Sequence, residues 1–247
     1  MNPTVILVGA DKGGVGKTTV SRVLLDYLGS LKLSARAFDT EFPRGTLKRF
    51  HPSVTEIVDV TSSSDQMRIL DTLSSAGPAV SIIDVRAGQL SLTLRMLEEV
   101  GFLDAVLAGQ FNFLVFHVIG PSISSLDEIA DIAPYAADAN YFLVKNFIND
   151  TTFFEWDPRT SAAYFKKIKR LGDITVPKLN EMAYEQVELA GVPFASFINN
   201  RNAAGGNAEF SFVLRGYVRS WLRNIAAEFE RVGLLNAMGG MPPKQSR

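Results

Sequence analysis

Two lysines flank a short run of glycines, which is followed by two threonines. The run extends from Lys12 to Thr19 and reads Lys-Gly-Gly-Val-Gly-Lys-Thr-Thr. Because glycine lacks a Cβ, the backbone N–H groups of such a loop can curve around phosphate oxygens. Lys17 is spaced to reach the β- and γ-phosphates of a nucleotide, and the hydroxyl of Thr18 is spaced to face Mg²⁺. The predicted contacts to the nucleotide are Gly13, Gly14, Val15, Gly16, Lys17, Thr18 and Thr19.

The segments on either side of this run match what a phosphate-binding loop requires. Residues 4–10 are almost entirely apolar, as in a buried strand, and residues 18–28 have helical periodicity. The helix would direct the partial positive charge of its N-terminus at the phosphates. A glycine-rich turn that merely joins a strand to a helix is the alternative, but it leaves the lysines and paired threonines unexplained.

The rest of the chain alternates between apolar runs and helical segments. Apolar runs occur at residues 5–9, 34–38, 80–83, 113–119 and 141–144, and helical periodicity recurs at 65–73. This alternation predicts an α/β fold with an open, mostly parallel twisted sheet flanked by helices on both faces. We expect a single P-loop NTPase domain over residues 1–238 and a frayed tail over 239–247.

Two acids stand at the ends of predicted strands, where an open parallel sheet binds its ligands. Asp84 follows the run Ser-Ile-Ile, which is the form of a Walker B strand, and Asp39 ends the second apolar run. Together with Thr18, they are the predicted Mg²⁺ ligands. The alternative is that each acid caps a turn or a helix.

The run Lys12 to Thr19 resembles the deviant Walker A signature of ParA/MinD ATPases, which belong to the SIMIBI class of P-loop NTPases. The resemblance implies an ATP hydrolase that forms a homodimer when ATP is bound, with Lys12 reaching the partner's nucleotide. Asp11 stands where a general P-loop has glycine. It either pairs with Lys12 or points to solvent, and we expect the latter.

Two further segments resemble the switch motifs of that family. Residues 85–88 are similar to switch II, with Arg86 in place of the usual proline, and the backbone of Gly88 is implied to contact the γ-phosphate. Residues 39–45 are similar to switch I, which implies that Asp39 lies beside the attacking water. The catalytic residues implied are therefore Lys12, Lys17 and Asp39. Glu41 and Phe42 depart from the motif and leave the hydrolysis rate open.

The resemblance also assigns residues to the base. Asn146 stands where the family has its adenine-contacting asparagine, and Pro177 falls in a segment, residues 174–177, that resembles a late loop beside the base. It is equally possible to interpret Pro177 as a proline that starts a helix. The aspartate that typifies the related GTPases is absent, so the implied cofactors are ATP and Mg²⁺.

Composition limits the partners. The net charge is −1 and there is no cysteine, so disulfides and thiolate metal sites are excluded. No leader or membrane-spanning run is evident, and we expect a cytoplasmic protein. Arg215, Arg219 and Arg223 recur at helical spacing and could bind DNA nonspecifically, although a solvated helix face is the alternative. Membrane attachment is disfavoured, because the C-terminal segment carries too little positive charge.

These observations predict a Mg²⁺-dependent ATPase that acts as a nucleotide-driven dimerisation switch and positions or partitions DNA or another cargo. An unidentified activator or cargo protein is implied as its partner. The alternative is an ATP-dependent metabolic ligase or transferase of the same P-loop architecture, but no extra polar cluster suggests a pocket for its second substrate. A tyrosine-kinase relative would carry a tyrosine-rich tail, and no tyrosine follows Tyr217.

Overall fold

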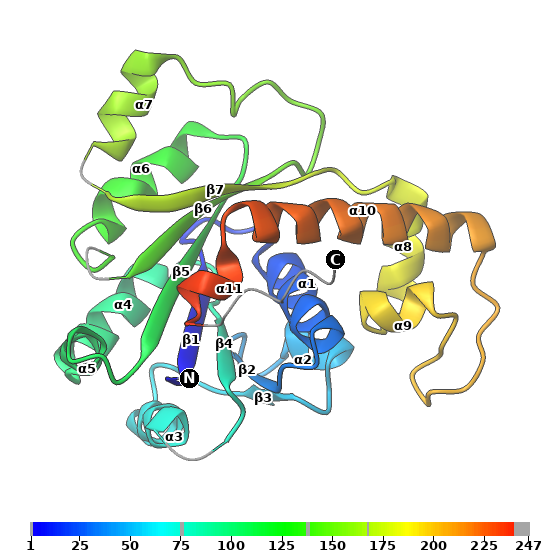
Figure 1. Ribbon diagram of the computed structural model, residues 1–247, viewed down its shortest axis with the longest axis horizontal. Helices are drawn as coiled ribbons and strands as arrows, with labels where there is room; N and C mark the ends of the chain where they lie inside the picture. Colours follow the sequence, from blue (N-terminus) through cyan, green and yellow to red (C-terminus); the bar gives the residue numbers. More distant parts are fainter. Residues whose placement is uncertain (1, 75–76, 137–138, 167, 240–247) are drawn as a thin grey trace, which may run out of the picture.

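The chain forms one seven-stranded sheet with helices on both faces (Figure 1). The computed structural model describes residues 2–74, 77–136, 139–166 and 168–239. The strands are β1 (Thr4–Gly9), β2 (Ala35–Asp39), β3 (Thr55–Ile57), β4 (Val80–Asp84), β5 (Asn112–Ile119), β6 (Asn140–Asn146) and β7 (Arg170–Val176). Their order across the sheet is β3-β2-β4-β1-β5-β6-β7, and every neighbouring pair among them is parallel. The predicted α/β architecture is therefore confirmed.

The helices divide between the two faces of the sheet. On the face that packs against β1 through Ile6 and Val8 lie α1 (Lys17–Ser30), α8 (Glu181–Ala190), α9 (Phe194–Ile198), α10 (Phe212–Arg231) and α11 (Leu234–Ala237), with α2 (Thr46–Phe50) beside α1. On the face that packs against Val5 and Leu7 lie α3 (Ser63–Ser74), α4 (Leu90–Glu99), α5 (Phe102–Leu107), α6 (Ile123–Ile132) and α7 (Pro158–Phe165).

The central strands are apolar throughout because both of their faces are covered. Every residue of β1 and of β4 is buried, and successive side chains of a strand point to opposite faces of the sheet. Parallel strands end at one edge, so the loops after β1, β2, β4 and β6 come together there. This edge carries the residues predicted to bind the nucleotide.

Two strands at the sheet edges were not predicted. β3 has only three residues, and β7 contains Gly172 and the charged residues Arg170 and Asp173, so neither makes a continuous apolar run. The segment 174–177, interpreted as a loop beside the base, is instead the end of β7 followed by Pro177. The helix and turn that follow are α8 and the left-handed residue Gly191.

Helix α11 lies near the start of β1, because the residue that follows the helix contacts Thr4. Met238 is fully buried and its carbonyl accepts hydrogen bonds from Thr4 and Asn112. Residues 240–247 of the predicted tail lie outside the described residues, and the predicted domain limits stay a prediction. Within the described ranges, no helix combines the length and apolarity needed to cross a membrane.

Candidate nucleotide-binding site

The glycine loop between β1 and α1 takes a shape that requires glycine at two positions. Gly14 and Gly16 have φ angles of 74° and 90°, which side chains rarely tolerate. A Cβ on Gly16 would also lie 2.1 Å from Nδ2 of Asn146. That nitrogen donates a hydrogen bond of 2.7 Å to the carbonyl of Val15. The end of β6 therefore supports the loop directly, which the sequence did not indicate.

Lys17 begins α1 and is almost fully buried, with 8% of its surface exposed. Its Nζ donates to the carbonyl of Lys12 at 3.0 Å and so spans the loop. Burial lowers the pKa of Lys17, and the neighbouring carboxylates, Asp84 first among them, oppose this shift. A buried ammonium with few partners gains from a polyphosphate that replaces its lost water.

Asp84 ends β4 and holds the first turn of α1 against the sheet. Its two carboxylate oxygens accept hydrogen bonds of 2.8 Å from the hydroxyls of Thr18 and Ser21. Burial and the nearby charge of Asp39 raise the pKa of Asp84 to about 7. Because the hydroxyl of Thr18 donates its proton to Asp84, its oxygen lone pairs are left to face a metal ion.

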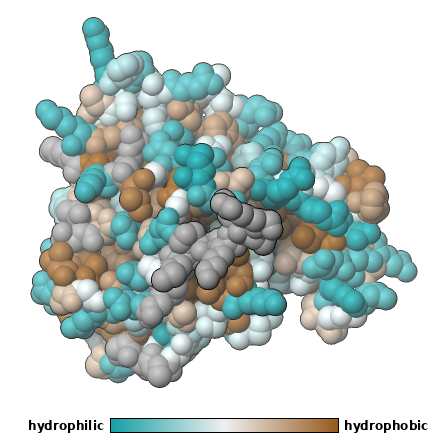
Figure 2. Space-filling model, viewed as in Figure 1, coloured by the Kyte–Doolittle hydropathy of each residue, from teal (hydrophilic) through white to brown (hydrophobic). Residues whose placement is uncertain are grey.

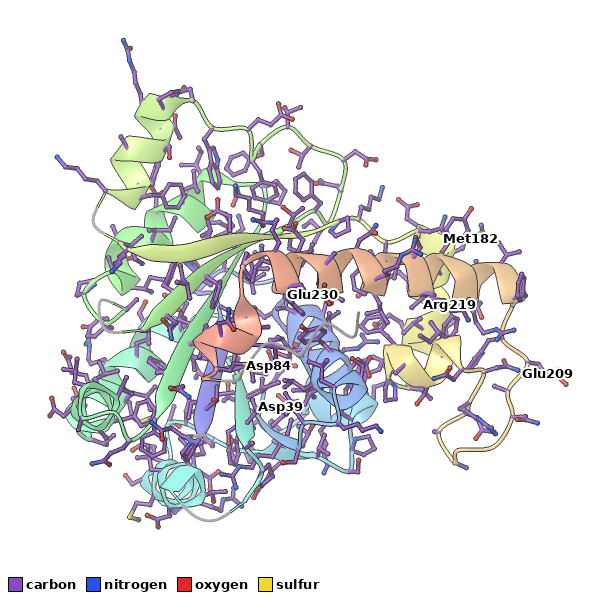
Figure 3. The ribbon with its side chains drawn as sticks, in the orientation of Figure 1. Asp39, Asp84, Met182, Glu209, Arg219 and Glu230 are labelled. Carbon is purple, nitrogen blue, oxygen red and sulfur yellow. The ribbon has the colours of Figure 1, made fainter. Side chains whose placement is uncertain are left out.

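Asp39 lies opposite Asp84 on the adjacent strand β2, and Figure 3 shows the two side chains together. Its carboxylate accepts backbone hydrogen bonds from Glu41 at 3.0 Å and from Lys48 at 3.1 Å. Burial raises its pKa as well. Two carboxylates and a hydroxyl are the hard oxygen donors that suit Mg²⁺, so the residues present fit the predicted metal.

The two predicted switch segments are joined by a hydrogen bond. The backbone N–H of Arg86 donates to Oγ1 of Thr40 at 2.7 Å. The side chain of Arg86 is exposed and lines the cavity described next, so it adds a positive charge there. The carboxylate of Glu41 accepts from the hydroxyl of Thr46 at the start of α2.

A cavity of about 400 Å³ brings these groups together. We call it the phosphate cavity; it is lined by Gly14, Gly16, Lys17, Thr18, Thr19, Asp39, Glu41, Thr46, Asp84, Val85, Arg86, Ala87 and Tyr184. Three residues predicted to touch the nucleotide, Gly13, Val15 and Gly88, line neither this cavity nor the one described next. The side chain of Val15 is buried beneath Gly120, so only its backbone could serve.

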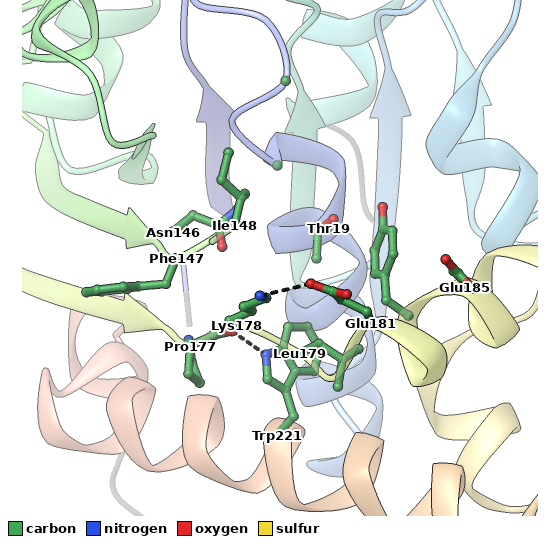
Figure 4. A pocket seen from close by; sticks show the side chains of 13 residues that line it. Thr19, Asn146, Phe147, Ile148, Pro177, Lys178, Leu179, Glu181, Glu185 and Trp221 are labelled. Carbon is green, nitrogen blue, oxygen red and sulfur yellow. Dashed lines mark hydrogen bonds and ion pairs between the residues drawn. The ribbon is translucent and has the colours of Figure 1, made fainter. Parts of the chain in front are cut away.

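A second cavity of about 340 Å³ continues from the first (Figure 4). We call it the base cavity; its lining includes the predicted Asn146 and Pro177, the unpredicted Trp221 and Lys178, and the first residues of α8. Gly14, Gly16, Thr19 and Tyr184 line both cavities. The two cavities therefore form one continuous site. Lys17, Asp39 and Asp84 lie at its phosphate end, and Phe147, Pro177 and Trp221 lie at its base end, which matches the charged and aromatic parts of a nucleotide.

Hydrogen bonds fix the walls of the base cavity before any base enters. The indole Nε1 of Trp221 donates to the carbonyl of Pro177 at 2.6 Å, and Lys178 forms an ion pair of 3.0 Å with Glu181 (Figure 4). One amide hydrogen of Asn146 is used by Val15, which leaves its oxygen and second hydrogen for a base. Its assigned contact with adenine stays a prediction.

Asp11 neither points to solvent nor pairs with Lys12, so our expectation for it was wrong. Its Oδ1 accepts from the backbone of Leu90 at 2.7 Å, and Oδ2 accepts from the hydroxyl of Ser91. Lys12 Nζ instead donates to Oγ of Ser122 at 2.7 Å and of Ser124 at 2.9 Å. Leu90 lies 79 residues away in the chain, and no local pattern could have indicated the contact.

Fold and glycine loop together define a P-loop NTPase architecture. No protein-family model and no curated protein matches the sequence. Among solved structures, the chain is similar to the septum site-determining protein MinD of Pyrococcus horikoshii OT3, complexed with Mg-ADP, at 16% identity over 94% of this chain and 98% of that chain, with a TM-score of 0.56. It is also similar to the MinD cell division protein of Aquifex aeolicus, at 15% identity over 99% and 100% of the two chains, with a TM-score of 0.53. At these identities the likeness establishes the fold.

We predict that Gly16→Ala destabilises the protein more than Gly14→Ala does. Both substitutions place a side chain at positive φ, which costs about 1–2 kcal/mol, but only the Gly16 Cβ meets Asn146, whereas nothing lies within 4 Å of the Gly14 Cβ. Chemical denaturation without nucleotide measures the difference. Adding Asn146→Ala to Gly16→Ala should recover part of it, and equal losses in both single variants would contradict the proposed steric contact.

A second prediction concerns pH. Asp84 and Asp26 each have an ordinary pKa of 3.8 that the fold raises to about 7. Between these values the folded protein binds more protons than the unfolded chain, so the free energy of unfolding should fall as pH rises from 4 to 7. Asp84→Asn should therefore raise the melting temperature at pH 7.5, by about 2–4 °C for each kcal/mol recovered.

Asp26→Asn is the matched control, because Asp26 lies on α1 outside both cavities and accepts from the backbone of Ala195 at 3.2 Å. It should raise the melting temperature in the same way but keep Mg²⁺-dependent nucleotide binding, which Asp84→Asn should lose. Calorimetry and titration with Mg-ADP measure both properties. Loss of binding in both variants would show that the effect of Asp84 is not specific to the metal site.

Proposed function

We propose that the protein is a ParA/MinD-type ATPase that binds ATP with Mg²⁺ and acts as a nucleotide-driven dimerisation switch in the cytoplasm. One observation carries this proposal. The glycine loop with Lys17, the two strand-end acids and the switch II segment, which are far apart in the sequence, line a single cavity. The fold shared with a MinD that was solved with Mg-ADP supports the same nucleotide and metal.

The proposed roles follow from the positions of the side chains. Lys17 and the loop amides bind the β- and γ-phosphates, while Thr18, Asp39 and Asp84 hold the metal ion, directly or through water. Mg²⁺ supplies positive charge that offsets the charge of the phosphates and of the two raised-pKa carboxylates. Asp39, the last residue of β2, orients the attacking water.

The proposed base is adenine, because Asn146 stands where the family has its adenine-contacting asparagine and the aspartate of the related GTPases is absent. Phe147, Ile148 and Trp221 give the base cavity apolar and aromatic surface, and Asn146 offers an amide to one edge of the base. The acids on this wall, Glu181 and Glu185, belong to α8. We assign Pro177 to the wall against which the base packs.

Lys12 carries the dimerisation part of the proposal. Its Nζ rests on the two serine hydroxyls where α6 begins, Ser122 and Ser124. A cation is disfavoured at the N-terminus of a helix, and neutral hydroxyls hold it only weakly. Lys12 is therefore free to leave when the triphosphate of a second copy offers a stronger partner.

DNA and an activator or cargo protein remain the proposed partners. On α10, Arg219 and Arg223 are exposed, while Arg215 is half-buried, and both Arg215 and Arg219 donate to the carbonyl of Ile198. These bonds place part of the arginine charge at the end of α9, and they support a structural role for Arg215 and Arg219 more than DNA binding. Figure 2 shows one face of the molecule that a protein partner could contact. On this face, hydrophilic side chains lie between the hydrophobic ones.

We predict that Lys12→Ala abolishes the larger species that ATP induces, because it removes the charge meant for the partner's triphosphate. Sedimentation velocity with Mg²⁺ and either ATP or ADP measures this. Lys169→Ala, which removes an exposed lysine outside both cavities, should leave the ATP-induced dimer intact. Identical sedimentation of the wild type in ATP and in ADP would contradict the switch.

We also predict that Asp39→Ala slows ATP hydrolysis by roughly 10²-fold, the scale for losing one group that orients or activates water. Because this variant should keep ATP bound without hydrolysing it, we expect it to accumulate as the dimer. Phosphate release and sedimentation on the same sample measure the two effects. Turnover by the wild type that requires an added small carboxylic acid would instead support the ligase or transferase alternative.

A further inference from the structure

Asp11 bonds to three separate elements through three of its groups. Its backbone N–H donates to Oε2 of Glu128 on α6 at 2.9 Å, and its carbonyl accepts from the backbone N–H of Gly88 at 2.7 Å. Its carboxylate accepts from the backbone of Leu90 and from the hydroxyl of Ser91. The residue that precedes Lys12 thus links the glycine loop to switch II, α4 and α6.

The carboxylate of Asp11 replaces a missing cap on α4. The residue at the N-cap position, Gln89, makes no side-chain hydrogen bond to the helix. Asp11 supplies an acceptor to the first turn from outside the helix, at 2.7 Å from Leu90 N, and its negative charge suits the positive end of the helix dipole. This contact anchors the side chain of Asp11 while its carbonyl holds Gly88.

We propose that Asp11 is a positioning residue that couples a γ-phosphate at Gly88 to the orientation of Lys12. This inference rests on the proposed function and on the γ-phosphate contact that the family resemblance implies for the N–H of Gly88, the residue after Ala87, which lines the phosphate cavity. A phosphate that accepts this N–H takes it from the carbonyl of Asp11. That carbonyl and the N–H of Lys12 belong to one rigid peptide plane, so the plane turns as a unit.

The hydrogen bonds of Asp11 to α4 and to Glu128 determine which part of the backbone rotates when the peptide plane turns. The carboxylate of Asp11 stays on α4 and Glu128 holds the preceding N–H, so the rotation is taken up at the Asp11–Lys12 peptide. Lys12 follows this peptide and leaves Ser122 and Ser124, whose hydroxyls hold it against the unfavourable end of α6. Alanine at position 11 keeps the carbonyl but loses the anchor.

Three variants test the coupling. Asp11→Ala removes the anchor, and Asp11→Asn keeps a capping oxygen. Asp157→Ala is the matched control, because Asp157 caps α7 by accepting from Arg159 and Thr160, and none of these residues lines either cavity. ADP affinity, dimerisation with a non-hydrolysable ATP analogue, and hydrogen exchange of the amides of residues 88–91 are measured on each.

We expect Asp11→Ala to weaken analogue-driven dimerisation roughly tenfold while its ADP affinity changes by less than about threefold, a scale usual for coupled sites. Asp11→Asn should retain most of the dimerisation, and Asp157→Ala should lower thermal stability only. In the wild type, exchange at residues 88–91 should differ between ADP and the analogue, and Asp11→Ala should remove this difference.

Wild-type dimerisation by Asp11→Ala, or an equal loss of its ADP affinity, would overturn the coupling and leave the proposed function standing. So would a wild type that binds both nucleotides without any difference in exchange at residues 88–91. A wild type that binds neither nucleotide would overturn the proposed function and the coupling with it. A wild type that binds ATP without dimerising would overturn only the switch, and the exchange measurement would still decide the coupling.

Discussion

The buried carboxylate of Asp84 joins the sheet to the helix that follows the glycine loop. Its bonds to Thr18 and Ser21 fix the first turn of α1, and with it the direction of the loop amides. A buried carboxylate is unfavourable unless charge and hydrogen bonds compensate for its lost water. Two hydroxyls and Lys17 compensate only in part, as the pKa of about 7 indicates. A bound cation would offset the part of this cost that the hydroxyls and Lys17 leave uncompensated. The carboxylate of Asp84 therefore destabilises the metal-free fold and favours binding of the metal.

The two cavities divide the work of binding between different kinds of surface. The phosphate cavity collects charged and hydroxyl groups from loops at the strand ends, where polar side chains meet backbone amides. The base cavity is walled by side chains of β6, α8 and α10, and a 2.6 Å bond from Trp221 to Pro177 ties two of its walls together. Asn146 belongs to both functions, since it supports the glycine loop while it lines the base cavity.

The parts predicted from sequence are those that local chemistry determines. The buried strands β1, β4, β5 and β6 are continuous apolar runs because both of their faces are covered, and the glycine loop and strand-end acids follow them directly. The edge strands β3 and β7 lack this signal. Tyr184 and Trp221 reach the site from helices late in the sequence, and the partners of the Asp11 carboxylate lie about 80 residues away. Contacts of this range depend on tertiary packing, which no local pattern records.

The side chain of Arg22 holds the helices beside the phosphate cavity and beside the base cavity in fixed positions relative to each other. It lies one turn after Thr18 on α1, with its guanidinium carbon 3.4 Å from the ring centre of Phe50 on α2 and 4.2 Å from that of Phe194 on α9. Its Nη1 forms an ion pair of 2.5 Å with Glu188 on α8. The guanidinium of Arg22 is buried whereas the carboxylate of Glu188 is partly exposed, so removing Glu188 would leave a buried charge without its charged partner. Helix α2, whose backbone holds Asp39, and helix α8, which lines the base cavity, therefore rest on the same side chain.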